Sequence, residues 1–236
     1  MHHRTASTIV LGLTAALALA ALPGCSTSPA PATPSGSDSA APRPDDKGDA
    51  KQSAAPMSSA QLRERLLDVD DLGTGYTRKA DRPAGNNDDV TVLGCPALDD
   101  LGADAATGSG GGLDFPRRAK ASFAHSSGAE VTEELYSDTG SKLSDGTGRI
   151  FDAMTGCPAY QVLASNTPID ITTQEVPAPQ FGDERWSHLL TFSSGGSKTV
   201  VKQTAIRDGS VLLIVSGSPA LVDRHLRAAL TKATAG

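Results

Sequence analysis

The run Val211-Leu212-Leu213-Ile214-Val215 most constrains the fold, because every one of its positions is apolar. Side chains of a strand alternate between the two faces of a sheet, so a strand that is apolar throughout must be covered on both faces. Two alternating segments precede it, Arg185 to Phe192 and Thr199 to Ile206, with turns at Gly195-Gly196 and Asp208-Gly209. The pattern predicts an antiparallel meander with a packing layer on each side.

Helical patterns before and after this meander can supply the two layers. Ser58 begins a capping box, and apolar residues recur at helical spacing as far as Leu72. A second helix is expected over about residues 141–155. A closing helix has Ser218 as its N-cap and Pro219 at its first position. Helices kept apart from runs of antiparallel strands are typical of the α+β class, which we therefore predict.

Shorter alternating segments complete an expected antiparallel sheet of about six strands. These further strands are predicted at Tyr76–Ala80, Lys120–His125, Glu130–Ser137 and Ile169–Val176. The residues of Asn86 to Asp89 and of Thr107 to Gly112 are typical of loops, and a short helix is expected at Pro96 to Leu101 between them. This region is expected to contain little regular structure.

The N-terminus has the pattern of an export signal. Arg4 precedes Ile9 to Leu22, a largely apolar run of 14 residues. As a helix this run would span about 21 Å, short of the roughly 30 Å hydrocarbon core, which favours a cleaved signal peptide over a retained membrane helix. Leu22-Pro23-Gly24-Cys25 resembles the bacterial lipoprotein box, although Pro23 departs from the small or aliphatic residue preferred there. The resemblance implies acylation of Cys25 and anchoring at the outer side of the cell membrane; plain secretion with cleavage elsewhere is the alternative.

The next segment lacks the residues that build a core. Residues 26–57 are rich in Pro, Ser and Ala, and Met57 is their only large apolar side chain. Such a composition cannot offset the entropy of folding and predicts a disordered tether. The expected organisation is a signal peptide over residues 1–24, acylated Cys25 with a tether to residue 57, and one α+β domain over residues 58–236.

Cys95 and Cys157 remain as a pair once Cys25 is assigned to the lipid. An exported chain lies in a compartment that permits oxidation, so we expect one disulfide. It would close a loop of about 63 residues and stabilise the domain by roughly 4 kcal/mol in the chain-entropy model. Two buried free thiols are the alternative. Redox catalysis is disfavoured, since it would require a Cys-x-x-Cys spacing that the sequence lacks.

The charge distribution argues against nucleic acid as a partner. The net charge is −6, and residues 58–114 contain 11 acidic and 5 basic side chains. The segment that begins Asp68-Val69-Asp70-Asp71 looks at first like a calcium loop, but Leu72 and Lys79 occupy two of the ligand positions. We therefore expect a solvated acidic face, and neither a metal site nor a cofactor.

The sequence contains no recognisable catalytic motif. The glycine-rich stretch Ser193 to Lys198 joins two strands and opens no helix, so it is a turn and not a phosphate loop. His125, His188 and His225 fall on a hairpin, a strand and a helix. The favoured interpretation is that all three have packing roles. An envelope hydrolase whose triad is assembled from distant residues would instead place one of them within reach of both a serine and a carboxylate.

Several features occur together in a recognisable order. The opening helix ends in Asp71-Leu72-Gly73-Thr74-Gly75-Tyr76, two separated Cys-Pro turns follow, and a helix closes the final meander. With the lipoprotein box and tether, this order resembles actinobacterial lipoproteins and, more distantly, the extracellular sensor domain of mycobacterial PknH-type kinases. The resemblance implies an antiparallel sheet flanked by helices around a cleft, with two disulfides; this chain has cysteines for one. It implies no kinase activity, because the chain contains no kinase domain.

A membrane-anchored, non-catalytic binding or sensing module is the first functional hypothesis. It predicts a cleft between sheet and helices, walled by Trp186 or Tyr136, that admits a small apolar or cell-wall-derived ligand. The hydrolase is the second hypothesis. The third is an assembly lipoprotein of the envelope with a protein-binding face, which predicts an exposed apolar patch.

Overall fold

The computed structural model describes residues 55–80, 90–106, 113–164 and 167–235. These residues belong to one compact unit that spans Lys47 to Gly236. The expected signal peptide, Cys25 and residues 26–54 of the expected tether lie outside the described residues, and so do the expected loops at 86–89 and 107–112. Within the described part, no helix has the length and apolar character needed to cross a membrane.

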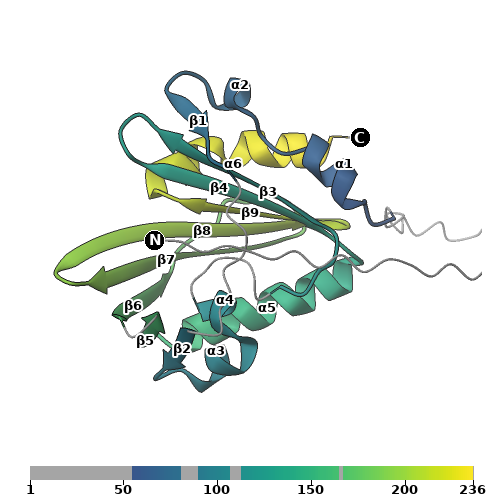
Figure 1. Ribbon diagram of the computed structural model, residues 1–236. Coiled ribbons are helices and arrows are strands. Elements are labelled where there is room, and N and C mark those ends of the chain that lie inside the picture. Colours follow the sequence, from purple (N-terminus) through teal and green to yellow (C-terminus); the bar gives the residue numbers. More distant parts are fainter. Residues whose placement is uncertain (1–54, 81–89, 107–112, 165–166, 236) are drawn as a thin grey trace, which may run out of the picture. The chain divides into compact units, whose positions relative to one another are not determined.

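Nine strands of the described residues form one antiparallel sheet, flanked by helices on both faces (Figure 1). Its order is β1-β3-β4-β9-β8-β7-β6-β5-β2. The strands are β1 (Tyr76–Arg78), β2 (Val90–Leu93), β3 (Arg118–His125), β4 (Glu130–Ser137), β5 (Ala159–Ala164), β6 (Thr167–Glu175), β7 (Glu184–Ser194), β8 (Ser197–Asp208) and β9 (Val211–Gly217). The helices are α1 (Ser59–Glu64), α2 (Val69–Leu72), α3 (Pro96–Leu101), α4 (Ala103–Ala106), α5 (Gly140–Gly156) and α6 (Pro219–Ala233). The α+β class is confirmed.

The sheet is larger than the expected sheet of about six strands, because β2 and β5 extend it beyond β6. In β5, Tyr160 and Val162 are buried while Gln161 between them is half-buried, so the alternation that indicates a strand is present in the sequence. β2 is only four residues long and forms the edge, with Val92 opposite Val162. A short strand that pairs with a distant segment leaves little local signal, which is why the sequence pattern did not predict it.

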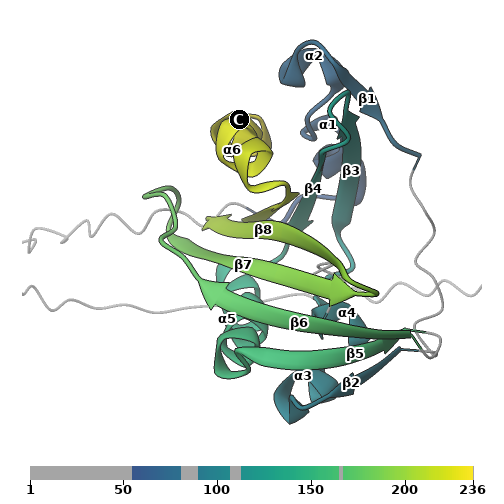
Figure 2. The ribbon, with the colours of Figure 1, turned by 90° about the vertical axis from the view of Figure 1, so that its left-hand side faces the viewer.

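The meander β7-β8-β9 lies where the sequence predicts it. Figure 2 shows α6 and α5 on opposite sides of the sheet. The last strand of the meander, β9, separates two apolar cores. Leu212 and Ile214 point into the core that α5 covers, whereas Leu213 and Val215 point into the core that α6 covers. All are at most 3% exposed. The all-apolar run is therefore covered on both faces, as predicted.

The opening helix is divided into two short helices. The capping box at Ser58 is present, but α1 ends before Arg65 and a second capping box at Asp68 begins α2. Between them, the backbone N–H of Leu67 donates to Oε2 of Glu133 on β4 at 2.7 Å. The helix expected to reach Leu72 is interrupted because this buried carboxyl, rather than a helical carbonyl, accepts the N–H.

The predicted disulfide between Cys95 and Cys157 is present. Cys95 precedes α3 and Cys157 follows α5, so the bond joins the start of one helix to the end of another. α5 itself matches the helix expected over about residues 141–155. Met57, at the end of the expected tether, packs against the α6 core and donates its N–H to Oγ of Ser137 at 2.9 Å.

Candidate ligand-binding cleft

A cleft of about 500 Å³ opens on the α5 side of the sheet. This volume falls within the range of about 300–1,000 Å³ that is usual for small-molecule sites. Its walls come from the second half of α5, the segment that follows β6, and the start of β7. The lining residues are Phe151, Asp152, Thr155, Glu175, Val176, Pro177, Ala178, Gln180, Arg185, Trp186 and Ser187.

The helical wall is held firmly against the sheet. Phe151 and Met154 of α5 are buried in the core below it. At the end of the helix, Oγ1 of Thr173 donates to the carbonyls of Met154, at 2.7 Å, and of Cys157, at 3.1 Å. Together with the disulfide at Cys157, these contacts fix the end of α5 to β6.

The opposite wall is the segment between β6 and β7, which is anchored at both ends. The N–H of Val176 donates to the carbonyl of Ser187 at 3.0 Å, and that of Asp183 donates to the carbonyl of Arg207 at 2.8 Å. Gly182 has φ +64°, and a Cβ there would lie 2.5 Å from the carbonyl oxygen of Arg207. Only glycine allows this close approach without displacement of the backbone. Both walls are therefore preorganised.

An aromatic surface forms the floor of the cleft. Trp186 is partly buried, with its ring centroid 6.0 Å from that of Phe151. The same Phe151 ring contacts the imidazole of His188, which is fully buried, with 4.5 Å between the ring centroids. Burial lowers the pKa of His188 to about 4, so the ring is neutral near pH 7 and behaves as part of the core. Trp186 therefore packs against a buried aromatic ring of α5.

Charged side chains surround the aromatic floor of the cleft. The side chains of Asp152, Glu175 and Arg185 are exposed, and none of these side chains makes a hydrogen bond or ion pair with another described residue. The hydroxyl of Thr155 already donates to the carbonyl of Phe151 at 2.9 Å. The polar groups of the cleft therefore point to a site that recognises charge or hydroxyl groups as well as an apolar face.

Of the two aromatic residues expected to wall a cleft, only Trp186 does so. Tyr136 is 3% exposed and its hydroxyl donates to Oε2 of Glu134 at 2.7 Å, while its ring packs edge-on against Phe115. The expectation for Tyr136 is wrong because this hydroxyl has a buried carboxylate as its acceptor, which lets the whole side chain lie inside the core.

The contacts of the three histidines differ from those of a catalytic triad. Nδ1 of His125 is 2.8 Å from Oγ of Ser127, and Nε2 of His225 is 2.7 Å from the hydroxyl of Tyr76. His188 contacts Phe151. In the part of the chain that the structure describes, none of the three contacts both a serine and a carboxylate, and this geometry counts against the hydrolase.

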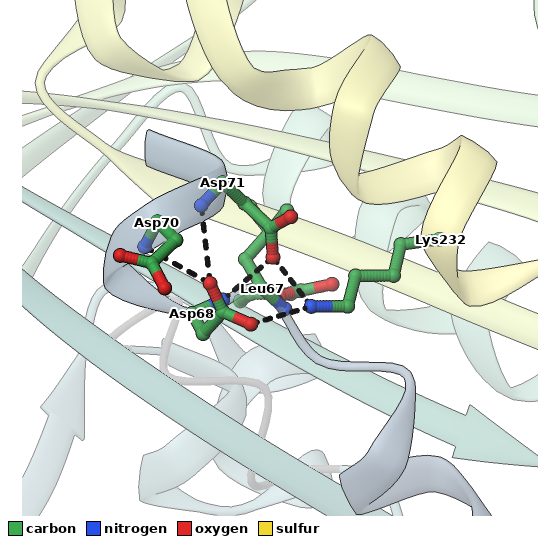
Figure 3. A network of polar contacts seen from close by, with 6 residues as sticks. Leu67, Asp68, Asp70, Asp71 and Lys232 are labelled. Atoms are coloured by element: carbon green, nitrogen blue, oxygen red, sulfur yellow. Dashed lines mark hydrogen bonds and ion pairs between the residues drawn. The ribbon is translucent and has the colours of Figure 1, made fainter. Parts of the chain in front are cut away.

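The acidic segment at α2 is held by a lysine of α6 (Figure 3). Nζ of Lys232 lies 3.0 Å from Oδ2 of Asp68 and also contacts the carboxylate of Asp71. The second oxygen of Asp68 accepts from the N–H groups of Asp70 and Asp71. These carboxylates thus tie the start of the folded unit to its last helix. Among the described residues, no group of three or more His, Cys, Asp or Glu side chains is arranged to hold a metal ion.

No protein-family model and no curated protein matches this chain. Among solved structures, the chain is similar to the extracellular domain of PknH from Mycobacterium tuberculosis, with a TM-score of 0.58 and 11% identity over 77% of this chain and 98% of that domain. The described unit has the fold of that extracellular domain. A second similar structure is the Rv0999 ortholog from Mycobacterium smegmatis, with a TM-score of 0.37 and 13% identity over 74% of this chain and 94% of that one.

Proposed function

We propose that this chain is a lipid-anchored, non-catalytic module that binds a small ligand outside the cytoplasm. The observation that carries the proposal is the cleft, whose two anchored walls and partly exposed Trp186 form a concave site in advance of any ligand. The fold shared with a kinase extracellular domain supports a sensing role, and the apolar N-terminal run that ends at Cys25 supports export and anchoring.

A protein-binding lipoprotein has less support. Large exposed apolar residues in the described part are Val69, Leu93 and Val200, which lie on α2, β2 and β8. Single exposed apolar residues on separate elements do not make the contiguous patch that a docking face requires.

Trp186 provides a direct test, because it is the only tryptophan of the chain. The full chain, purified in mild detergent, is examined by native mass spectrometry for a co-purified ligand. Any ligand released is then titrated back while Trp186 emission is followed. We expect a saturable change in emission, since the indole lines the cleft.

A matched pair of variants locates the binding. Ala178→Phe places a ring in the cleft, whereas Ala159→Phe adds the same ring at an exposed position of β5 outside the lining. We expect Ala178→Phe to weaken binding at least about tenfold and Ala159→Phe to leave it unchanged. Equal binding by both variants, with folding verified by circular dichroism, would show that the ligand binds elsewhere.

Anchoring is tested separately through Cys25. Replacement by serine removes the sulfur that would carry the lipid, so Cys25→Ser should move the protein from the membrane fraction to the soluble fraction and abolish incorporation of labelled fatty acid. A Cys25→Ser protein that stays in the membrane fraction would refute the lipid anchor and leave the cleft proposal untouched.

A further inference from the structure

The side chains around the cleft indicate which chemical class it would bind, an inference that rests on the function proposed above. Asp152 on α5 and Glu175 at the end of β6 present carboxylates that no described residue neutralises. Arg185 contributes one positive charge. The two acids therefore exceed the single base, and this excess repels a phosphate or carboxylate ligand while it attracts an ammonium group.

The same two carboxylates make the cleft a strong acceptor of hydrogen bonds. Carboxylates only accept hydrogen bonds, and they accept most strongly from a charged donor. The hydroxyl of Thr155 donates to Phe151 and Asp152 carbonyls within its own helix, at 2.9 and 3.2 Å. A ligand with N–H and O–H donors therefore finds strong acceptors at both carboxylates, while its oxygen atoms can accept from Arg185 and Gln180.

The floor of the cleft requires an apolar face on the same ligand. Trp186 lies at a 37° interplanar angle to Phe151, whose buried ring also contacts His188. An indole supported in this way offers a flat surface with a negative face, which attracts both the C–H groups of a saturated ring and an adjacent cation. A purely aliphatic chain would leave the surrounding charges without partners.

We infer that the cleft binds an amino sugar, with the ring stacked on Trp186 and a protonated amine between Asp152 and Glu175. Sugar hydroxyls supply further donors, while Arg185 and Gln180 reach the ligand's oxygen atoms. An amino-substituted pyranose carries the apolar C–H face, the hydroxyl rim and the ammonium in one compact unit, whereas a fatty acid has neither hydroxyl rim nor ammonium and a phosphate group adds negative charge.

The test uses ligands that differ in one feature. The full chain is titrated with a trimer of glucosamine, with the corresponding trimer of N-acetylglucosamine, and with glucose 6-phosphate, in mildly acidic buffer that keeps the amines protonated. Trp186 emission reports binding. We expect the glucosamine trimer to bind at least about tenfold more tightly than the acetylated trimer, because acetylation removes the charge, and glucose 6-phosphate to bind weakest.

Substitutions of Asp152 and Glu175 test whether these two carboxylates cause the preference for the glucosamine trimer. Asp152→Asn with Glu175→Gln should bring the affinity for the glucosamine trimer down to that of the acetylated trimer. The control, Asp145→Asn with Asp170→Asn, removes two exposed carboxylates from α5 and β6 outside the lining and should keep the preference. An equal or stronger response to the acetylated or phosphorylated sugar, or an unchanged preference in Asp152→Asn with Glu175→Gln, would overturn the inference.

Failure of the inference can be told from failure of the proposed function. If no sugar changes Trp186 emission but a set of small aromatic fragments does, and Ala178→Phe abolishes that response, the cleft binds ligands of another class and only the amino sugar is wrong. If neither sugars nor fragments alter the emission, both are wrong.

Discussion

Glu133 is the residue whose surroundings differ most from those its chemistry favours. Its side chain is 1% exposed on the α6 side of β4, where one oxygen accepts from Leu67 and the other has no hydrogen-bond partner among the described residues. Burial raises its pKa from an ordinary 4.5 to about 7, against the opposing effects of the Leu67 N–H and of Lys232. The protonated form is therefore the one that the fold accommodates.

This shift predicts that stability falls as pH rises from about 5 to 8. Between the unfolded pKa near 4.5 and the folded pKa of about 7, the unfolded chain releases the Glu133 proton while the folded chain retains it, so rising pH favours unfolding. The contribution lost by pH 8 is roughly 3 kcal/mol. Urea unfolding at a series of pH values should show this decline, and Glu133→Gln should remove it.

Glu130→Gln is the matched control, because Glu130 lies on the same strand but is exposed. It should retain the pH dependence of the original chain. The assignment to Glu133 would be refuted by a Glu133→Gln protein whose stability declines with pH as steeply as that of the control.

At the scale of single elements, α5 shows tertiary packing prevailing over local propensity. The helix contains Gly146 and Gly148, each of which weakens a helix interior by roughly 1 kcal/mol relative to alanine. It still runs from Gly140 to Gly156, because one face buries Leu143 and Met154 completely and its end is held by the disulfide. Tertiary packing therefore stabilises this helix despite the low helix propensity of its glycines.

The two glycines of α5 should respond differently to alanine. At Gly148 a Cβ would meet nothing within 4 Å, so Gly148→Ala should stabilise the protein by about 0.5–1 kcal/mol. At Gly146 a Cβ would lie 2.8 Å from Cζ of Phe115, whose ring is packed in the core. Gly146→Ala should therefore stabilise the protein less than Gly148→Ala does, or destabilise it, as measured by thermal unfolding. A larger gain at Gly146 than at Gly148 would contradict this.

The disulfide between the start of α3 and the end of α5 should stabilise the folded protein, because it restricts the conformations of the unfolded chain. Replacement of Cys95 and Cys157 by alanine should lower the free energy of unfolding by roughly 2–4 kcal/mol in urea titrations. Reductant should lower the stability of the original chain toward that of the double variant, and should leave the double variant unchanged. No effect of reductant on the original chain would show that the bond contributes little.

At the scale of the folded unit, one sheet serves two cores. β9 contributes alternate residues to the α5 core and the α6 core, so the two cores share this strand. Lys202 of β8 and Asp223 of α6, with Nζ 2.6 Å from Oδ1, add a polar contact across the α6 side. This arrangement favours cooperative unfolding of both faces.

Leu213 tests this cooperativity, because it lies in the α6 core while Trp186 lies on the α5 side. Leu213→Ala should lower the free energy of unfolding by roughly 2–5 kcal/mol. The unfolding midpoint should shift equally whether unfolding is followed by Trp186 emission or by far-UV circular dichroism. Val200→Ala, at a 42% exposed position, should shift it little. If the Trp186 transition stays unchanged in Leu213→Ala, the two cores unfold independently.

The parts of the fold that depend on neighbouring residues can be predicted from local sequence patterns. The meander, the closing helix and the α+β class follow from periodicity and turn residues, because adjacent antiparallel strands need only a short connection. The pairing of Cys95 with Cys157 follows from having two cysteines once Cys25 is set aside. The position of Trp186, His188 and Leu190 on one face of β7 also follows from strand alternation.

The sheet edge and the site depend instead on how distant segments pack together. β2 pairs with β5 although a long stretch of chain separates them, and such pairing depends on which surfaces remain uncovered after the rest has packed. The cleft is formed by α5, the segment after β6, and β7, each of which brings side chains from a different part of the sequence. Concavity is a property of how these elements pack, whereas periodicity reports only which face of each element is buried.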